Sequence, residues 1–284
     1  MTVIRAVLDH EHPPAFDIDA EDRDAMEIFH AQTCLDRRTA GRRGRIVDRF
    51  VSDPATIVAS ACLYQPELGD TVLPLPETPS PAVTFDALLR SRVSTRRDVL
   101  GGSVRLNDIA GVLSLSVRAT REYRHPRADC RVALRAYPSA GSLYPCEVYL
   151  WPVATEGLAP RPYRYDAARH ALVDYGRPDG DFRAVERCTD TDPQAVAIIV
   201  TGVLDRTVPK YGLRGYRFAL LEAGHIGQSL VLAATALGLP SLVYGSYFEN
   251  ELAARLGVDG LNEVVLSVVL IGAGDVANHV CRED

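Results

Sequence analysis

The sequence lacks the features that mark disulfide-rich, membrane-spanning and nucleic-acid-binding proteins. Its 6 cysteines are scattered without a Cys-x-x-Cys spacing, so neither a disulfide framework nor a zinc site is expected. Polar residues interrupt its apolar stretches well before the length of a membrane span. Its formal net charge of -6 argues against nucleic acid as a partner, because phosphate contacts need clustered Lys and Arg.

The first residues also lack the basic and apolar regions of a secretory signal peptide. The apolar pair Val3-Ile4 is soon followed by the polar run His10-Glu11-His12. That run could ligate a metal, but no partner cluster accompanies it, and we expect no metal site. Together with cysteines typical of reduced thiols, these features predict a cytoplasmic protein.

The amino-acid composition is typical of a soluble globular protein, and helical patterns come first in the chain. Of its 284 residues, 47% are hydrophobic and 24% are charged, which is enough apolar material for a sizeable core. Residues 19–33 and 45–63 carry helical patterns, with Pro54 as a break. The proline-dense residues 66–81 then predict an extended connector. We therefore expect residues 1–82 to form an N-terminal helical extension and its connector.

The remaining residues, 83–284, alternate helical and strand patterns and predict one larger domain. Helical patterns cover residues 85–92, 107–117, 218–237 and 249–256. Strand patterns cover residues 146–153, 163–165, 170–175, 195–203 and 264–271. Thr84 is the expected N-cap of the first of these helices. Strands separated by helices, with hairpins among them, predict an α+β fold around a mixed sheet.

Residues 92–97 place three guanidinium groups and two hydroxyl groups directly after a predicted helix. Arginine offers paired donors and Ser or Thr offers short ones, which is a combination that suits a phosphate group. A charged helix end has the same composition. By itself, this segment therefore leaves both a phosphate site and a solvated surface open.

Residues 137–145 (YPSAGSLYP) form a loop between two strand-like segments. Small residues allow the backbone to approach a flat ligand closely and to offer it N–H and C=O groups. A surface loop bracketed by prolines has the same composition, so both interpretations stay open at this point.

Residues 210–218 place a lysine, two tyrosines and two arginines at the entrance of the long helix, which continues through Glu222 and His225. A helix entrance normally needs only a cap and some acidic side chains. A lysine and a phenol beside fixed cations could move a proton. The structural alternative is a solvated loop whose arginines balance Glu222.

The order of these segments resembles the SagB-type dehydrogenases of the nitroreductase superfamily. An Arg-x-Ser-x-Arg element is followed by PSAGSLYP, by KYGLRGYRFALLEAGHIGQSL, by a Gly-Leu helix stop and by a terminal strand. Upstream, residues 29–33 (FHAQT) are similar to the short His-x-x-Ser/Thr element that precedes the core of the family. The resemblance covers most of the chain and is strongest from about Phe85 to Gly272.

This resemblance implies a nitroreductase-like α+β fold, with a mostly antiparallel sheet flanked by helices, and a homodimer that holds FMN at its interface. Arg92, Ser94 and Arg96 match the element of the family that binds the FMN phosphate and ribityl chain. Lys210 and Tyr211 match its pair for proton removal. The loop along the isoalloxazine ring is matched by Pro138, Ser139, Ala140, Gly141 and Leu143, and the backbone after the long helix by Gly245.

Many members of the family oxidise azoline rings to azoles in precursor peptides. The resemblance therefore implies an FMN-dependent azoline dehydrogenase of natural-product biosynthesis, with O2 as electron acceptor. Its implied partners are a peptide or carrier-bound azoline substrate and a cyclodehydratase. This oxidation removes a proton and a hydride from adjacent positions, so a flavin can take the hydride while a desolvated lysine serves as base.

Two other functions stay open. An NAD(P)H-dependent nitro or quinone reductase would share the fold but needs no dedicated base, so the Lys210-Tyr211 pair favours azoline oxidation. A non-catalytic flavin-binding subunit of a peptide-modifying complex would keep the phosphate and ring loops and tolerate the loss of Lys210. One departure concerns the phosphate. Classical nitroreductases often place a basic residue near the C-terminus, where this chain offers only His279 and Arg282.

Overall fold

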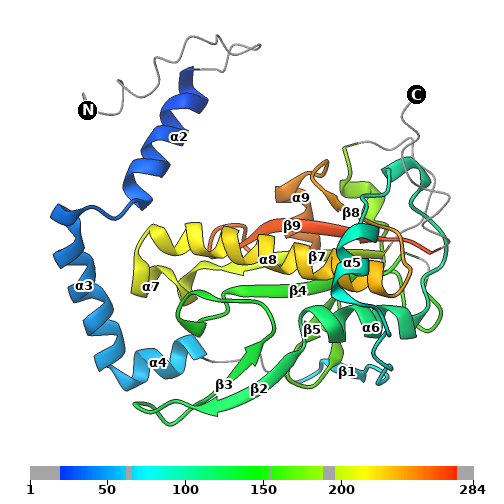
Figure 1. The fold of residues 1–284 in the computed structure, drawn as a ribbon, viewed down its shortest axis with the longest axis horizontal. Coiled ribbons are helices and arrows are strands. Elements are labelled where there is room, and N and C mark those ends of the chain that lie inside the picture. The colour runs from blue at the N-terminus through cyan, green and yellow to red at the C-terminus, as the bar shows by residue number, and fades with distance from the viewer. Residues whose placement is uncertain (1–19, 62–65, 154, 188–195, 274–284) are drawn as a thin grey trace. The chain divides into compact units, whose positions relative to one another are not determined.

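The computed structural model describes residues 20–61, 66–153, 155–187 and 196–273 (Figure 1). The chain divides into two compact units, residues 1–41 and 42–284. The first unit contains α2 (Ala20–Thr33), which confirms the helix predicted over residues 19–33. No helix among the described residues is long and apolar enough to cross a membrane.

Part of the helical extension belongs to the second unit. α3 (Arg37–Ser52) crosses the division and α4 (Pro54–Ala61) follows it, with the break at proline that the sequence predicts. Phe50 is buried in a small apolar cluster with Ile57 and with Leu143 of the main domain. This packing places residues 42–61 in one compact unit with the main domain.

Seven strands form one sheet. In spatial order they are β1 (Thr71–Pro74), β6 (Ala171–Asp174), β5 (Tyr163–Asp166), β4 (Cys146–Trp151), β7 (Val196–Val203), β9 (Glu263–Ile271) and β8 (Ser241–Tyr244). A mixed, mostly antiparallel sheet was expected, and every described pairing is antiparallel. Although β7 and β8 run in the same direction, they do not pair with each other. β9 lies between them and pairs antiparallel with both.

The proline-rich stretch predicted as a connector supplies the edge strand β1. Thr71 pairs with Asp174 and Pro74 with Ala171, so residues 71–74 are part of the main sheet. Proline is tolerated in this strand because an edge strand leaves one side without partners. The predicted connector is therefore wrong for residues 71–74, because proline content alone does not reveal this short edge strand.

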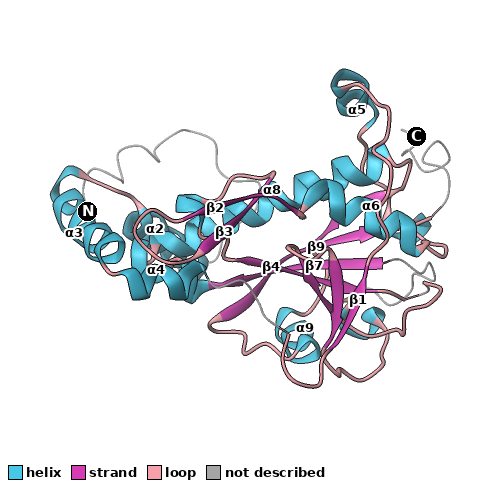
Figure 2. Ribbon diagram, turned by 90° about the horizontal axis from the view of Figure 1, so that it is seen from below, coloured by secondary structure: helices cyan, strands magenta, loops and turns pink. Residues whose placement is uncertain are grey.

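Side chains of β7 alternate between two cores, as predicted for a strand buried on both faces. Ile198 and Val200 belong to the core that includes residues of α6 (Leu106–Ser116) and α8 (Arg214–Ala236). Ala197 and Ile199 belong to the other core, which includes residues of α9 (Glu249–Leu256). α8 lies along one face of the sheet and α9 lies on the other (Figures 1 and 2).

Two helix boundaries position the candidate site. Thr84 Oγ1 accepts the Ala87 N–H at 3.3 Å, which confirms the predicted N-cap of α5 (Phe85–Ser91). α8 begins before the predicted residue 218, and a separate short turn, α7 (Val208–Tyr211), precedes it. α7 ends at Gly212, whose φ of 60° is a conformation that glycine adopts readily. Lys210 and Tyr211 therefore lie on their own turn.

A second, two-stranded sheet was not predicted. β2 (Ala119–Arg124) and β3 (Arg131–Arg135) form an antiparallel hairpin that stands apart from the main sheet (Figure 2). β2 is almost entirely exposed and carries three arginines or glutamates, so it offers no apolar alternation to recognise. β3 leads directly into the YPSAGSLYP loop.

The structure bears on three of the six cysteines. Cys34, Cys130 and Cys146 are free thiols, in line with the expected reduced state. The other three cysteines and the run His10-Glu11-His12 lie outside the described residues.

Candidate functional site

The loop between β3 and β4 is conformationally strained. Its short helical turn η2 (Ala140–Ser142) contains Gly141 at φ 65°, and Ser142 and Tyr144 have φ values of 56° and 45°. For a residue with a Cβ this left-handed conformation costs roughly 1–2 kcal/mol. Such strain persists only where surrounding contacts enforce it, and it is common at functional sites.

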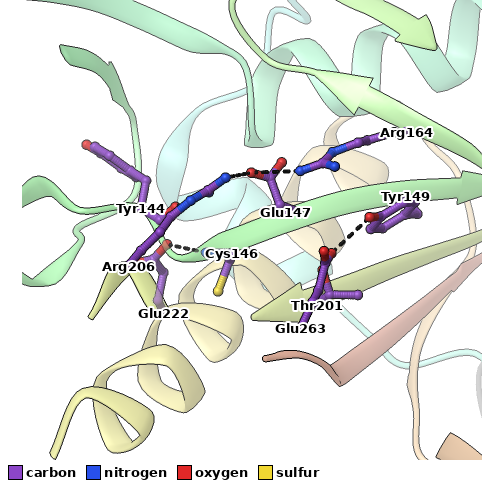
Figure 3. Close-up of polar contacts among 9 residues, drawn as sticks. All are labelled: Tyr144, Cys146, Glu147, Tyr149, Arg164, Thr201, Arg206, Glu222 and Glu263. Carbon is purple, nitrogen blue, oxygen red and sulfur yellow. Dashed lines mark hydrogen bonds and ion pairs between the residues drawn. The ribbon is translucent and has the colours of Figure 1, made fainter. Parts of the chain in front are cut away.

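Contacts on both sides of Tyr144 enforce this conformation. The Tyr144 N–H donates to Ser139 Oγ at 2.9 Å, and its hydroxyl accepts the Arg135 N–H at 3.1 Å. The Arg135 guanidinium also lies 4.5 Å from the centroid of the Tyr144 ring. Arg206 donates through Nη1 to the Tyr144 carbonyl at 2.9 Å, so it ties the end of β7 to the loop (Figure 3).

Glu147 holds Arg206 in this position from within the sheet. Its Oε1 lies 2.5 Å from Arg206 Nη2 and 3.2 Å from Arg164 Nη2 (Figure 3). Burial alone would raise the pKa of Glu147, but the guanidiniums of Arg206, Arg164 and Arg135 outweigh burial and hold this pKa below its usual value. The carboxylate therefore stays ionised, and the loop is anchored to a rigid part of the fold.

The structure brings three of the predicted site residues into contact. A Cβ on Gly141 would lie 2.6 Å from Lys210 Nζ and 2.5 Å from the Tyr211 hydroxyl. The ends of these two side chains therefore occupy the space that any other residue at position 141 would need. Leu143, from the same loop, is buried in the apolar cluster against which Tyr211 packs. The predicted ring loop and the predicted proton-transfer pair thus form one site.

The environment of Lys210 lowers the pKa of its ammonium group. Burial lowers the pKa of the Lys210 ammonium and raises the pKa of the Tyr211 phenol. Nζ lies 5.3 Å from the centroid of the Phe50 ring, and among the described residues no carboxylate forms an ion pair with it. The sequence predicts a desolvated lysine and places it near the fixed cations Arg214 and Arg217, so either burial or these cations could lower its pKa. Burial accounts for the lowered pKa, and the Arg214 guanidinium lies over the Phe218 ring instead.

Lys210 stands out in the sequence for a reason that is independent of any motif. The 31 Lys and Arg residues of the chain include this single lysine. An arginine cannot lose its proton in a protein, whereas a desolvated lysine can. Lys210 is therefore the one side chain among these 31 that could lose its proton and act as a base.

Glu222 of α8 lies beneath the loop and is a further functional candidate. Only 2% of this residue is exposed, and its Oε1 accepts the Cys146 N–H at 3.3 Å (Figure 3). Burial raises the pKa of Glu222 to about 7, against the opposing effect of hydrogen bonds from Ser139 and Cys146. The sequence places Glu222 and His225 three residues apart on this helix. The structure buries Glu222 and leaves His225 exposed.

The predicted phosphate element begins at the end of α5. Arg92 is its C-cap residue and donates through Nη1 to Ser94 Oγ at 3.3 Å. Arg96 forms an exposed ion pair with Asp98. Between them, the Thr95 N–H donates to the Ser241 carbonyl at 2.9 Å, which fixes the element beside β8. The buried hydroxyl group of Thr95 has no hydrogen-bond partner among the described residues.

Arg97, the third guanidinium of this segment, has a structural role. Its Nε and Nη2 each lie 2.8 Å from a carboxylate oxygen of Glu186, whose side chain is fully buried. This bidentate pair joins η1 (Arg97–Val99) to the segment after η3 (Phe182–Val185). Arg97 is therefore committed to Glu186 inside the fold, which leaves Arg92 and Arg96 as the guanidiniums of the predicted phosphate element.

The phosphate element and the Lys210 site lie at opposite ends of β9. Val203, which precedes the Lys210 turn, pairs with Glu263 at the start of β9, whereas Ser241 pairs with Ile271 at its end. Nine residues of strand separate these ends by about 27 Å. Figure 1 likewise shows α7 at one end of α8 and α5 at the other.

The remaining predicted cofactor residues are distributed between these places. Pro138 is exposed and Ala140 is partly buried, and both belong to the ring loop. Gly245 is exposed after the last residue of β8, with nothing within 4 Å of the position of a Cβ. The structure therefore does not place Gly245 against Gly141. No cluster of His, Cys, Asp and Glu within the described part of the chain could hold a metal ion.

Curated proteins and a protein family match this chain. Residues 89–273 match the family described as the Nitroreductase family. The nitroreductase-like protein MJ1384 of Methanocaldococcus jannaschii is 26% identical over 195 residues, which cover 67% of this chain and 92% of that protein. The microcin B17-processing protein McbC of Escherichia coli is 29% identical over 160 residues, which cover 52% of this chain and 57% of McbC.

Solved structures share the fold. A nitroreductase-like protein of Anabaena variabilis matches with a TM-score of 0.63 and 23% identity, covering 86% of this chain and 45% of that one, so this chain spans less than half of that protein. A chain of the E. coli microcin synthetase McbBCD complex with truncated pro-MccB17 bound matches with a TM-score of 0.54 and 21% identity, covering 91% of this chain and 95% of that one. Together with the match over residues 89–273, these findings establish that the chain belongs to the nitroreductase family.

Proposed function

We propose that this chain is an FMN-dependent dehydrogenase that oxidises azoline rings to azoles in a peptide natural-product precursor, with O2 as the electron acceptor. Membership of the nitroreductase family makes it an oxidoreductase. The observation that carries the finer proposal is the convergence of Lys210 Nζ and the Tyr211 hydroxyl on Gly141, within a strained loop. The similarity to a microcin B17-processing protein supports a peptide substrate.

The reaction requires a base beside a ring that can give up a hydride. Lys210 in its neutral form takes a proton from a ring carbon of the azoline, and the hydride leaves the adjacent ring atom, so the ring loses two hydrogens and becomes aromatic. FMN, when bound, would supply the acceptor for that hydride, and O2 would take up the two hydrogens in total as H2O2. The lowered pKa of Lys210 increases its neutral fraction, and the Tyr211 hydroxyl can polarise the ring or share the proton.

The residues of this chain fit FMN in two separate places. The ring loop offers an exposed glycine without a Cβ beside Lys210, which suits a flat ring at close approach. At the other place, Arg92 and Ser94 offer charged and hydroxyl donors, and the Thr95 hydroxyl still lacks a partner among the described residues. These groups would hold the phosphate and the ribityl chain.

A second copy of the chain would bring the two places together. The length of β9 separates them by about 27 Å within one chain, which exceeds the length of an FMN molecule. α8 offers an apolar surface for such a contact, because Leu213 at its N-cap, Leu220 and Leu221 are 42%, 40% and 55% exposed. We therefore propose a homodimer in which each FMN is held by the phosphate element of one copy and the ring loop of the other.

The proposal also extends to partners. The E. coli complex with a similar chain contains further subunits and a bound pro-peptide, so we propose that a cyclodehydratase forms the azoline and delivers the peptide to this enzyme. Family relatives with the nitroreductase name favour a second candidate, an NAD(P)H-dependent nitro or quinone reductase. That reaction uses no dedicated base, so it leaves the half-buried Lys210 without a function.

The test is to purify the full chain, record its absorption spectrum and offer it an azoline peptide in air without NAD(P)H. We expect a yellow protein and a peptide that loses the mass of two hydrogen atoms. Lys210→Ala and Lys210→Arg should both keep FMN and abolish turnover, because neither side chain can accept the proton. Full activity in Lys210→Arg would contradict the role of base. A protein that stays colourless with added FMN would contradict the whole assignment.

A further inference from the structure

A groove lies beside the Lys210 turn, between α3, α4 and the start of α7. Its volume is about 630 Å³, which is within the roughly 300–1,000 Å³ of pockets that bury small ligands. The residues that line it are Arg42, Arg45, Ile46, Arg49, Phe50, Asp53, Thr56 and Pro209. All of these residues belong to the second compact unit of the chain.

The groove carries an excess of positive charge. Arg42, Arg45 and Arg49 recur at the spacing that places side chains along one side of a helix, and all three are exposed. Within the described part of the chain, none of the three forms an ion pair. The single acid of the groove, Asp53, instead accepts the Ala55 N–H at 3.1 Å and the Thr56 hydroxyl. It thereby caps α4 rather than neutralising an arginine.

The groove adjoins the site proposed for chemistry. Pro209, which lines it, directly precedes Lys210 in α7. Phe50 also lines the groove, and the Lys210 ammonium lies 5.3 Å from the centroid of its ring. A peptide whose azoline ring lies against Lys210 would therefore have its neighbouring residues within reach of the groove.

From this placement we infer that the groove binds an acidic segment of the substrate peptide, next to the ring that is oxidised. This inference rests on the proposed function and adds to it the sequence character of the substrate. Guanidinium groups pair with carboxylates through two parallel hydrogen bonds. Ile46, Phe50 and Pro209 would take apolar side chains between the acids, which a bare phosphate or a nucleic acid does not offer.

The first experiment measures binding alone, with the full chain and labelled peptides that contain no azoline. One peptide alternates Glu and Leu, and its matched control alternates Gln and Leu. We expect the Glu peptide to bind more tightly and to be weakened about tenfold in the double variant R45Q/R49Q, from the loss of charge-assisted hydrogen bonds. The control variant R187Q/R255Q removes the same charge from exposed positions elsewhere, and we expect no change there.

Several outcomes would overturn the inference. One is equal binding of the Glu peptide by R45Q/R49Q and by the unchanged protein, and another is equal binding of the Glu and Gln peptides. A third is binding of 4′-phosphopantetheine through these arginines without binding of the Glu peptide, which would point to a carrier-bound substrate. A fourth is a change in oligomeric state in R45Q/R49Q alone, which would make the groove a contact between copies of the chain.

The second experiment separates this inference from the proposed function. Azoline peptides with and without flanking Glu residues are compared as substrates of the unchanged protein and of R45Q/R49Q. We expect KM for the acidic peptide to rise about tenfold in the variant, with kcat unchanged, and the neutral peptide to be unaffected. If neither azoline peptide is oxidised, the proposed function fails. The binding result then still decides whether the groove takes acidic peptides. Oxidation of both peptides with equal KM would instead contradict the inference that the groove binds acidic peptides, and it would still support the proposed azoline oxidation.

Discussion

At the scale of single residues, the candidate site depends on Gly141. Its φ of 65° is unfavourable for a residue with a Cβ, and that Cβ would also meet Lys210 Nζ at 2.6 Å. Gly157 offers a matched control, since its φ is 83° and nothing lies within 4 Å of the position of its Cβ. The two glycines therefore share the backbone strain and differ in the neighbouring side chains.

We expect Gly141→Ala and Gly157→Ala to lose similar stability, on the order of 1 kcal/mol each. Only Gly141→Ala should lose activity, by roughly a hundredfold in kcat, because the Lys210 and Tyr211 side chains must move away from the position of the substrate. Urea unfolding and steady-state kinetics of both variants measure these effects. Equal activities would show that the contact with Lys210 has no role in turnover.

Glu222 makes stability dependent on pH. Its carboxyl group has a pKa of about 7 when folded, compared with 4.5 as the ordinary value, because burial penalises the charged form. Between these two values the folded chain binds more protons than the unfolded chain, so the contribution to stability falls as pH rises. The stabilising contribution of protonated Glu222 is fully present below about pH 4.5 and is lost by about pH 7.

We expect the free energy of unfolding of the unchanged protein, relative to Glu222→Gln, to fall by about 3 kcal/mol over this range. Glutamine keeps the shape of the side chain and does not titrate. Urea unfolding of both proteins at a series of pH values measures the difference. A difference that stays constant with pH would mean that Glu222 is ionised in the folded protein.

At the scale of elements, Arg96 and Arg97 are neighbours with opposite expected roles. Arg97 joins η1 to the buried Glu186, and losing one partner of a buried pair typically costs about 3–5 kcal/mol. The Arg96–Asp98 pair is exposed, and such pairs contribute roughly 0–1 kcal/mol.

We expect Arg97→Met to lower the free energy of unfolding by about 3 kcal/mol, and Arg96→Met to change it by less than about 1 kcal/mol. Arg96→Met should instead weaken FMN binding, because Arg96 belongs to the segment that matches the phosphate-binding element of the family. Chemical unfolding without cofactor and flavin titration separate the two effects. A stable Arg97→Met variant would refute the structural role of the Arg97–Glu186 pair.

Elements with strong local patterns were predicted well and those without them were not. The N-cap at Thr84, the buried strand β7 and the hairpin of β5 and β6 each carry a local signal in the sequence. The edge strand β1 and the hairpin of β2 and β3 do not. Their residues are proline-rich or mostly exposed, and they form strands only because a neighbouring strand completes their hydrogen bonds.

At the scale of the whole molecule, the proposed flavin site predicts association through α8. Leu221 is 55% exposed on this helix, and Leu261 is 77% exposed in the loop before β9. We expect Leu221→Lys to weaken the dimer and to lose FMN, because the charge must be desolvated in an apolar contact. Leu261→Lys should remain dimeric and yellow.

Sedimentation of both variants, together with their flavin content, measures this prediction. A monomeric protein that still binds FMN fully would contradict a site shared between two copies. A Leu221→Lys variant that remains dimeric would place the contact elsewhere on the surface.

The sequence by itself determined the family, the order of its motifs and most elements of the main domain, because these depend on local spacing and turn residues. Only the tertiary structure decided which motifs meet. It brings Gly141 to Lys210 and Tyr211, commits Arg97 to Glu186 and buries Glu222 beneath the loop. It also separates the phosphate element from the ring loop by the length of β9. These relations depend on strand order and on contacts between residues far apart in the chain, which no local pattern contains.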